Sequence, residues 1–82
     1  MKKRQSELIR WILQSPGLPF ETALEKLHVS KRTLYYDIEE INYCLRHCAQ
    51  LKKIAGQLVF VGDLQRVSQM IADQELTLQG TE

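Results

Sequence analysis

The chain has 82 residues, which is enough for one small domain and excludes most metabolic enzyme folds and any catalytic cleft between two domains. Hydrophobic residues make up 44% and charged residues 26%, as in ordinary globular domains, while four glycines and two prolines argue against an all-β fold. The longest uninterrupted apolar run, Leu58 to Val61, is far shorter than the ~20 residues of a membrane-spanning helix, so we predict no membrane partner. Two cysteines four positions apart predict no disulfide framework, and we expect a cytoplasmic protein.

The net charge of +1 hides an uneven distribution. Residues 1–53 carry ten basic and six acidic side chains, a net charge of +4. Residues 54–82 carry one basic and four acidic side chains, a net charge of −3. Solvated surface charge explains this polarity as well as a polyanion-binding face does, unless the basic residues gather on one side of the fold.

Apolar residues at helical spacing predict two helices near the start of the chain. Residues 5–14 carry a broad apolar stripe, and Ser15-Pro16-Gly17 ends that helix. Residues 19–28 repeat the same spacing over about two turns and predict a second, short helix.

The third helix has the clearest pattern. Its apolar residues recur at steps of 4, 3, 4 and 3: Leu34, Ile38, Ile41, Leu45 and Cys48. This spacing predicts a helix from Lys31 to about His47. Ser30 stands directly before it and is a good N-cap, because its hydroxyl can accept a hydrogen bond from the first turn.

The period then changes. Residues 51–55 and 58–61 predict two strands around a two-residue turn, Gly56-Gln57, which together form a β-hairpin. Asp63 can cap a last helix from Leu64 to about Glu75. The apolar face of that helix exceeds what a small core covers and favours a homodimer; its residues are Val67, Met70 and Ile71.

This order of elements is the plan of a winged helix-turn-helix. The predicted fold class is therefore mainly α with a small β-hairpin, with a three-helix core plus wing in residues 1–62. Residues 63–82 are predicted to form an extra C-terminal helix or linker, leading to regulatory domains of a longer protein. In this fold the third helix, residues 31–47, enters the major groove of double-stranded DNA, which is about 12 Å wide.

The start of the third helix places cationic and aromatic residues opposite its apolar stripe. We expect Lys31, Arg32 and Tyr35 to contact bases. We expect contacts to the DNA backbone from Ser30, Thr33, Tyr36, Lys52 and Lys53. Two cations oppose the macrodipole at a helix N-terminus, which a bound anion would explain. Simpler interpretations stay open: solvated charge for Lys31 and Arg32, partial burial for Tyr36, capping for Thr33, and a charged strand edge for the two lysines.

Other polar residues carry no recognisable chemistry. We expect Asp37 to make a contact within the domain, for instance with Arg32 or Arg10. The cysteines and histidines lack zinc-site spacing, and the chain has no phosphate-binding glycine loop or nucleophile elbow. We therefore predict no metal, no cofactor and no enzymatic activity.

The string from Val29 to Asn42, VSKRTLYYDIEEIN, resembles the recognition-helix pattern of bacterial sugar-operon regulators, in which a Val-Ser turn precedes an Arg-Thr pair and an Asp-Ile or Asp-Leu pair follows. Over residues 5–62 the chain resembles the N-terminal winged helix-turn-helix of transcription activators with phosphotransferase-system regulation domains, of the mannitol and lichenan operon types. Repressors of the DeoR kind share a similar string. The resemblance implies a DNA-binding module of a longer bacterial regulator of carbohydrate genes. Leu58 and Phe60 stand where the family's wing has a glycine and a tyrosine.

Two alternatives to duplex DNA remain. A winged helix that docks on a protein needs an exposed apolar patch on its third helix. An RNA-binding domain, as in related antiterminators, needs single-stranded or wing-based recognition, because the deep and narrow major groove of A-form RNA excludes a helix.

Overall fold

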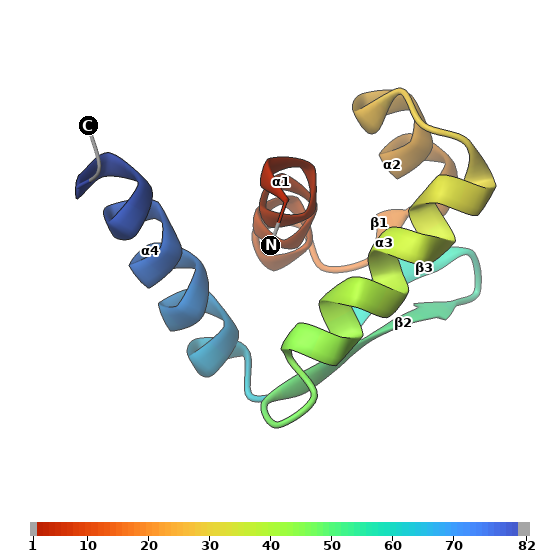
Figure 1. The fold of residues 1–82 in the computed structure, drawn as a ribbon. Helices are drawn as coiled ribbons and strands as arrows, with labels where there is room; N and C mark the ends of the chain where they lie inside the picture. Colours follow the sequence, from red (N-terminus) through yellow and green to blue (C-terminus); the bar gives the residue numbers. More distant parts are fainter. Residues whose placement is uncertain (1, 81–82) are drawn as a thin grey trace.

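The computed structural model describes residues 2–80, and the side chains of residues 2–73. This part of the chain forms four helices and one three-stranded antiparallel sheet (Figure 1), which confirms a mainly α class with a small β-hairpin. The helices are α1 (Lys3–Gln14), α2 (Phe20–Leu27), α3 (Lys31–Cys44) and α4 (Leu64–Gly80). The strands are β1 (Leu18–Pro19), β2 (Ala49–Ile54) and β3 (Gln57–Gly62).

Local signals set the ends of the first two helices. α1 begins at Lys3, two residues before the predicted start. After α1, Gly17 adopts a φ of 84°, a left-handed conformation that glycine reaches without strain, and the chain enters β1. α2 ends where His28 takes the left-handed conformation, with φ 55° and ψ 46°. The turn between α2 and α3 is therefore three residues long, 28–30.

α3 ends earlier than predicted. Its last residue is Cys44 rather than His47. Leu45 follows at once and is fully buried. The backbone N–H groups of Cys48 and Ala49 both donate to the Leu45 carbonyl, at 2.8 and 2.9 Å, and close a tight reversal into β2. Because Ala49 already belongs to the strand, the chain has no room for another helical turn.

The sheet contains one strand that the sequence pattern did not predict. Its order is β1-β3-β2, and β1 pairs with β3 through only two residues, too few to show an alternating pattern. The hairpin turn is Ala55-Gly56 rather than Gly56-Gln57, with positive φ at both residues, 53° and 77°, as a type I′ turn requires. Gln57 instead belongs to β3, where it pairs with Ile54.

α4 packs against the core beside α1. Val67 is fully buried, Ile71 is 5% exposed, and Met70 is half-buried. The argument for a homodimer from these residues is therefore wrong, because the core of the same chain covers them; dimerisation itself stays a prediction. The backbone of α4 continues to Gly80, five residues beyond the predicted end.

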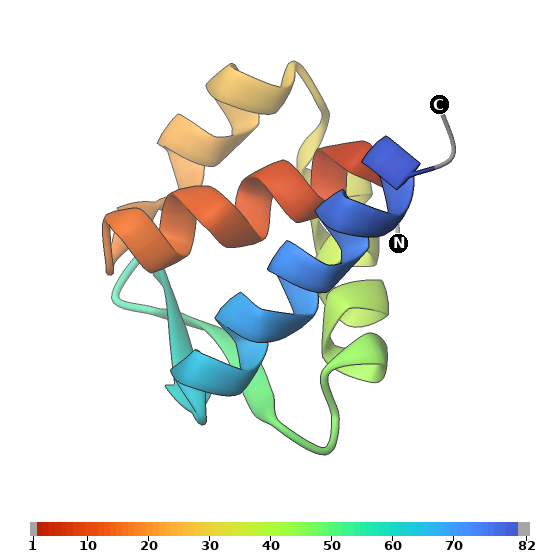
Figure 2. The same ribbon diagram turned by 90° about the vertical axis from the view of Figure 1, so that its left-hand side faces the viewer.

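α1 lies at the centre of the fold, between α4 on one side and α2 and α3 on the other (Figure 1). Figure 2, turned by 90°, has α4 in front and the beginning of α3 at the back. α4 therefore lies on the opposite side of the molecule from the first turn of α3.

Candidate nucleic-acid interface

The first turn of α3 is fixed by its own cap. The Ser30 Oγ accepts a hydrogen bond from the Thr33 N–H at 3.2 Å and donates one to the Thr33 Oγ1 at 3.1 Å. The predicted cap is therefore confirmed. Because the Ser30 hydroxyl proton is used within the cap, the hydroxyl proton that remains for an outside acceptor belongs to Thr33.

Lys31 and Arg32 are both exposed. The Lys31 Nζ lies 4.0 Å from the Glu21 Oε1 in the first turn of α2, but the two side chains are 68% and 73% exposed, so this ion pair is loose. The Arg32 guanidinium carbon lies 5.8 Å from the centre of the Tyr36 ring, and that tyrosine is 52% exposed. Neither contact takes the positive charge out of water, so both cations are open to an anion.

Tyr35 joins α3 to α2 and to β2. Its ring centre lies 5.1 Å from that of Phe20, and its Oη accepts a hydrogen bond from the Lys53 Nζ at 3.1 Å. The same Nζ lies 4.3 Å from the centre of the Phe20 ring, within the range of a cation–π contact. Phe20 is 2% exposed, whereas Tyr35 is 45% exposed. A buried ring thus supports an exposed phenol and an exposed ammonium.

Lys52 and Lys53 lie on opposite faces of the sheet. Lys53 pairs with the buried Leu58 across the hairpin, and Lys52 pairs with Val59. Side chains alternate along a strand, so Lys53 shares the face that α2 and α3 cover, and Lys52 points away from them. The structure therefore separates two lysines that we predicted to act together.

The hairpin turn is tied to the start of α2. The Phe20 N–H donates to the Gly56 carbonyl at 2.9 Å, next to the pairing of β1 with β3. The beginning of α2, the beginning of α3 and the end of β2 consequently meet at one end of the molecule, on the right-hand side of Figure 1.

Asp37 is buried, and it pairs with Arg4 rather than with the predicted Arg32 or Arg10. It is 1% exposed and accepts hydrogen bonds from the Arg4 Nε and Nη2 at 2.7 and 2.8 Å. The predicted partners were wrong because α1 starts earlier than expected and places Arg4 against the flank of α3.

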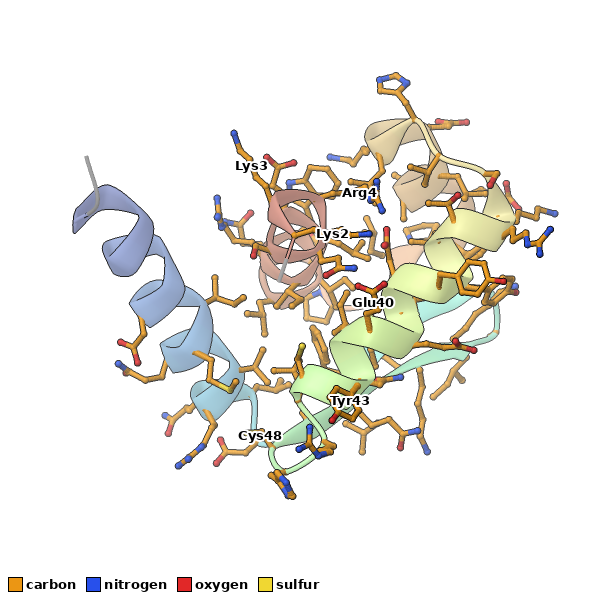
Figure 3. The ribbon with its side chains drawn as sticks, viewed as in Figure 1. Lys2, Lys3, Arg4, Glu40, Tyr43 and Cys48 are labelled. Carbon is orange, nitrogen blue, oxygen red and sulfur yellow. The ribbon has the colours of Figure 1, made fainter. Side chains whose placement is uncertain are left out.

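Gln5 connects the same two helices. It is 1% exposed, and its Nε2 donates to the Asp37 Oδ1 at 3.0 Å and to the Glu40 Oε2 at 2.8 Å. In Figure 3, Arg4 and Glu40 lie between α1 and α3, whereas Lys3 points away from α3. Arg4, Gln5, Asp37 and Glu40 are referred to below as the α1–α3 clamp.

Within the clamp, Arg4 and Asp37 form an ion pair at neutral pH. Burial by itself raises the pKa of Asp37, but hydrogen bonds from Arg4 and Gln5, together with the Arg4 charge, outweigh burial, so the pKa lies below its ordinary value. The hydrogen bond to Asp37 in turn raises the pKa of Arg4.

The two cysteines lie in different segments of the structure. Cys44 is exposed at the end of α3, and Cys48 lies beyond it, with its Sγ 3.7 Å from the Met70 Sδ. Among the described residues, no three His, Cys, Asp or Glu side chains come together in a group that could hold a metal ion. Within residues 2–80, no helix has both the length and the apolar character that crossing a bilayer requires.

Sequence reasoning missed several contributors to these contacts, among them Gln5 and Glu40 of the clamp. The helical spacing of residues 19–28 does not distinguish Phe20 from the other apolar residues of α2, and nothing in the pattern marks Glu21 or Arg4 as a contact of α3. The alternation of side chains along β2 would have separated Lys52 from Lys53 in advance. For Glu21 and Arg4 no local signal exists, since their partners lie far away in the sequence.

No family model, curated protein or solved structure matches this chain. The residues and contacts described above are therefore the basis for assigning a function.

Proposed function

We propose that the chain is a winged helix-turn-helix domain that binds double-stranded DNA sequence-specifically, as part of a bacterial transcription regulator. In this assignment α1, α2 and α3 are the three-helix core, β2 and β3 are the wing, and α3 is the recognition helix. Three features support it: the three-residue turn between α2 and α3, the capped start of α3, and a hairpin that directly follows α3. A role in carbohydrate gene control follows only from the resemblance of residues 5–62.

One observation carries the proposal: four exposed side chains of suitable chemistry converge at one end of the molecule. Lys31, Arg32 and Tyr35 come from the first two turns of α3, and Lys53 comes from β2 through its hydrogen bond to Tyr35. Three cations in such proximity create a positive potential that attracts phosphate. α4, on the opposite side, carries one basic and two acidic residues in its sequence.

Each residue has a distinct task in this complex. Arg32 presents a planar fork that matches the O6 and N7 acceptors of guanine in the major groove, and Lys31 donates to neighbouring acceptors. Tyr35 contacts a base edge or a thymine methyl group from the next turn. Thr33, Tyr36 and Lys53 donate to phosphates on either side of the groove, with Ser30 acting through the cap.

The surface of α3 weighs against a protein-docking role. Among the described side chains, the large hydrophobic ones that α3 exposes are all tyrosines: Tyr35, Tyr36 and Tyr43. The Arg46 guanidinium carbon lies 4.3 Å from the centre of the Tyr43 ring. Phenols beside cations suit a polyanion better than an aliphatic groove.

The first experiment selects a ligand and tests its class. The full 82-residue chain is incubated with a library of random 20-base-pair duplexes, and the enriched sequence is compared with its single strands and with the RNA duplex of the same sequence. We expect the DNA duplex to bind most tightly. The logarithm of its affinity should fall as the logarithm of the salt concentration rises, with a slope of about −0.9 for each phosphate that a lysine or arginine neutralises. Preference for RNA, or binding that does not depend on salt, would contradict the proposal.

The second experiment uses neighbouring lysines as a matched pair. Lys53→Gln should weaken binding to every duplex and reduce the salt slope by about 1, whereas Lys52→Gln, on the other face of the sheet, should leave the slope unchanged. Arg32→Ala should cost about 1–3 kcal/mol of binding free energy and relax specificity at one base pair. Equal effects of the two lysine substitutions would place the interface elsewhere.

A further inference from the structure

We infer that the α1–α3 clamp is a positioning device for DNA recognition: Arg4, Gln5 and Asp37 contact no DNA but fix the rotation of α3 about its own axis. The inference rests on the proposed function and identifies residues of α1 on which sequence discrimination depends.

The buried stripe of α3 does not by itself define a rotation. It consists of aliphatic side chains, Leu34, Ile38 and Ile41, and Leu45 continues it directly after the helix. Apolar contacts are non-directional, and a small rotation exchanges one set for another of similar area. Asp37 lies on the flank of that stripe and, at 1% exposure, is nearly as buried as its neighbours. A buried polar residue within an apolar seam is a known means of fixing the register of packed helices.

The hydrogen bonds of Asp37 are directional, and they leave little freedom. Both carboxylate oxygens are engaged, Oδ2 by the Arg4 Nε at 2.7 Å and Oδ1 by the Arg4 Nη2 at 2.8 Å. The parallel pair of bonds requires the planar guanidinium and the carboxylate to be nearly coplanar. The Gln5 side chain donates one hydrogen bond to Asp37 and one to Glu40. Its own Oε1 accepts a hydrogen bond from the backbone N–H of Lys2 at 3.2 Å.

The opposite flank of α3 is held by a second polar attachment. Asn42 bonds both backbone groups of Leu51 in β2, with its Nδ2 3.1 Å from the carbonyl oxygen and its Oδ1 2.6 Å from the nitrogen. Asp37 and Asn42 are five positions apart, about 140° around a helix that advances ~100° per residue. Attachments on two flanks, one to α1 and one to β2, define the rotation of α3 between them.

Rotation matters because the recognition side chains stand away from the helix axis. At a radius of about 6 Å, a rotation of about 20° moves a side-chain head by about 2 Å. That displacement exceeds the distance range in which a hydrogen bond to a base edge forms. Phosphate contacts tolerate it better, because long flexible cations follow the backbone charge. Loss of the clamp should therefore reduce discrimination between sequences more than it reduces non-specific affinity.

The test measures the ratio of affinities for the selected duplex and for a scrambled duplex of the same composition. The double variant Arg4→Met with Asp37→Leu removes one positive and one negative charge, so the net charge of the chain is unchanged. Gln5 keeps its bond to Glu40 in this variant. The control removes one cation and one carboxylate of α1 outside the clamp, as Lys3→Met with Glu7→Gln. We expect the ratio to fall at least tenfold in the clamp variant, while its affinity for the scrambled duplex stays within threefold of wild type. In the control variant we expect the ratio itself to stay within threefold of wild type.

A second readout needs no DNA. Residual dipolar couplings of the backbone amides report the orientation of α3 relative to α1, which we expect to change in the clamp variant and not in the control. An unchanged ratio together with unchanged orientation would overturn the inference. If the double variant does not fold, Arg4→Lys keeps the charge but loses the paired bonds; a ratio within twofold of wild type would then overturn it. If wild type binds duplex DNA no more tightly than single strands, the proposed function fails. The residual dipolar couplings alone then test whether the clamp fixes the orientation of α3.

Discussion

Asn42 is the residue whose removal tests the assembly of the candidate interface most simply. Its side-chain amide pairs with both backbone groups of Leu51, as a neighbouring strand would, on the edge of β2 that β3 leaves unpaired. The residue thereby connects α3 to the strand that carries Lys53. Asn42→Ala removes the amide and leaves both Leu51 backbone groups without this partner.

The expected loss of stability follows from the two hydrogen bonds. A neutral hydrogen bond contributes about 0.5–1.5 kcal/mol net, and leaving a buried group unsatisfied costs about 1–3 kcal/mol. Leu51 is 2% exposed, so water reaches its backbone poorly. We therefore expect Asn42→Ala to lower the free energy of unfolding by about 2 kcal/mol. For a domain of this size that corresponds to a fall in Tm of about 8–16 °C.

Thermal unfolding followed by circular dichroism measures this effect, with Gln50→Ala as the control. Gln50 is exposed and lies next to Leu51 in β2, with its side chain on the other face. Asn42→Asp should also destabilise the fold, because a carboxylate accepts from the Leu51 N–H but repels its carbonyl oxygen. A fall in Tm of less than about 3 °C in Asn42→Ala would refute the reasoning, since water would then replace the amide without cost.

The remaining predictions concern three other positions. The pKa of Asp37 is lowered in the folded state, so its contribution to stability is present above the unfolded pKa of about 3.9 and is lost as the pH falls through the folded pKa. Below about pH 4, the free energy of unfolding in urea should therefore fall more steeply with pH for wild type than for Asp37→Asn. Equal pH slopes for the two proteins would contradict this. Glu21→Gln should raise affinity for any duplex about two- to fivefold at low salt, because its carboxylate stands 4.0 Å from the Lys31 Nζ inside the interface, while Glu25→Gln one turn away should change little in the same titration. Gly62→Ala should destabilise the fold by about 1–3 kcal/mol in denaturant titrations, because φ is 130° and a Cβ would lie 2.6 Å from a backbone oxygen; a loss below 0.5 kcal/mol, roughly the effect of an ordinary surface change, would show that the chain yields there.

The elements that the sequence predicted well are those whose signals are local. The repeating apolar residues of α3 lie within one segment, and Ser30 caps the helix by a hydrogen bond to Thr33, three residues later. Periodicity and capping rules were therefore sufficient. The hairpin followed from β-branched residues around a turn that contains Gly56, with an error of one residue in the position of the turn.

The features that the sequence could not predict depend on contacts between distant segments. Arg4 and Asp37 are 33 positions apart, and neither carries a mark of its partner. β1 is too short for any pattern, yet it ties the hairpin to α2. Similarly, the contact of Lys53 with Tyr35 requires knowing both the side-chain alternation in β2 and the path of α3 across it. Composition suggested a cationic surface; only the packing of α3 against α1 and β2 brings its members together.

The most direct measurement is an amide chemical-shift titration of the 15N-labelled chain with the selected DNA duplex. We predict that the largest changes fall on residues 30–36 and on Lys53, while residues 64–73 of α4 keep their shifts. Changes that concentrate on α4, or on the face of the sheet that carries Lys52, would contradict the claim that the first turns of α3 form the DNA-binding surface.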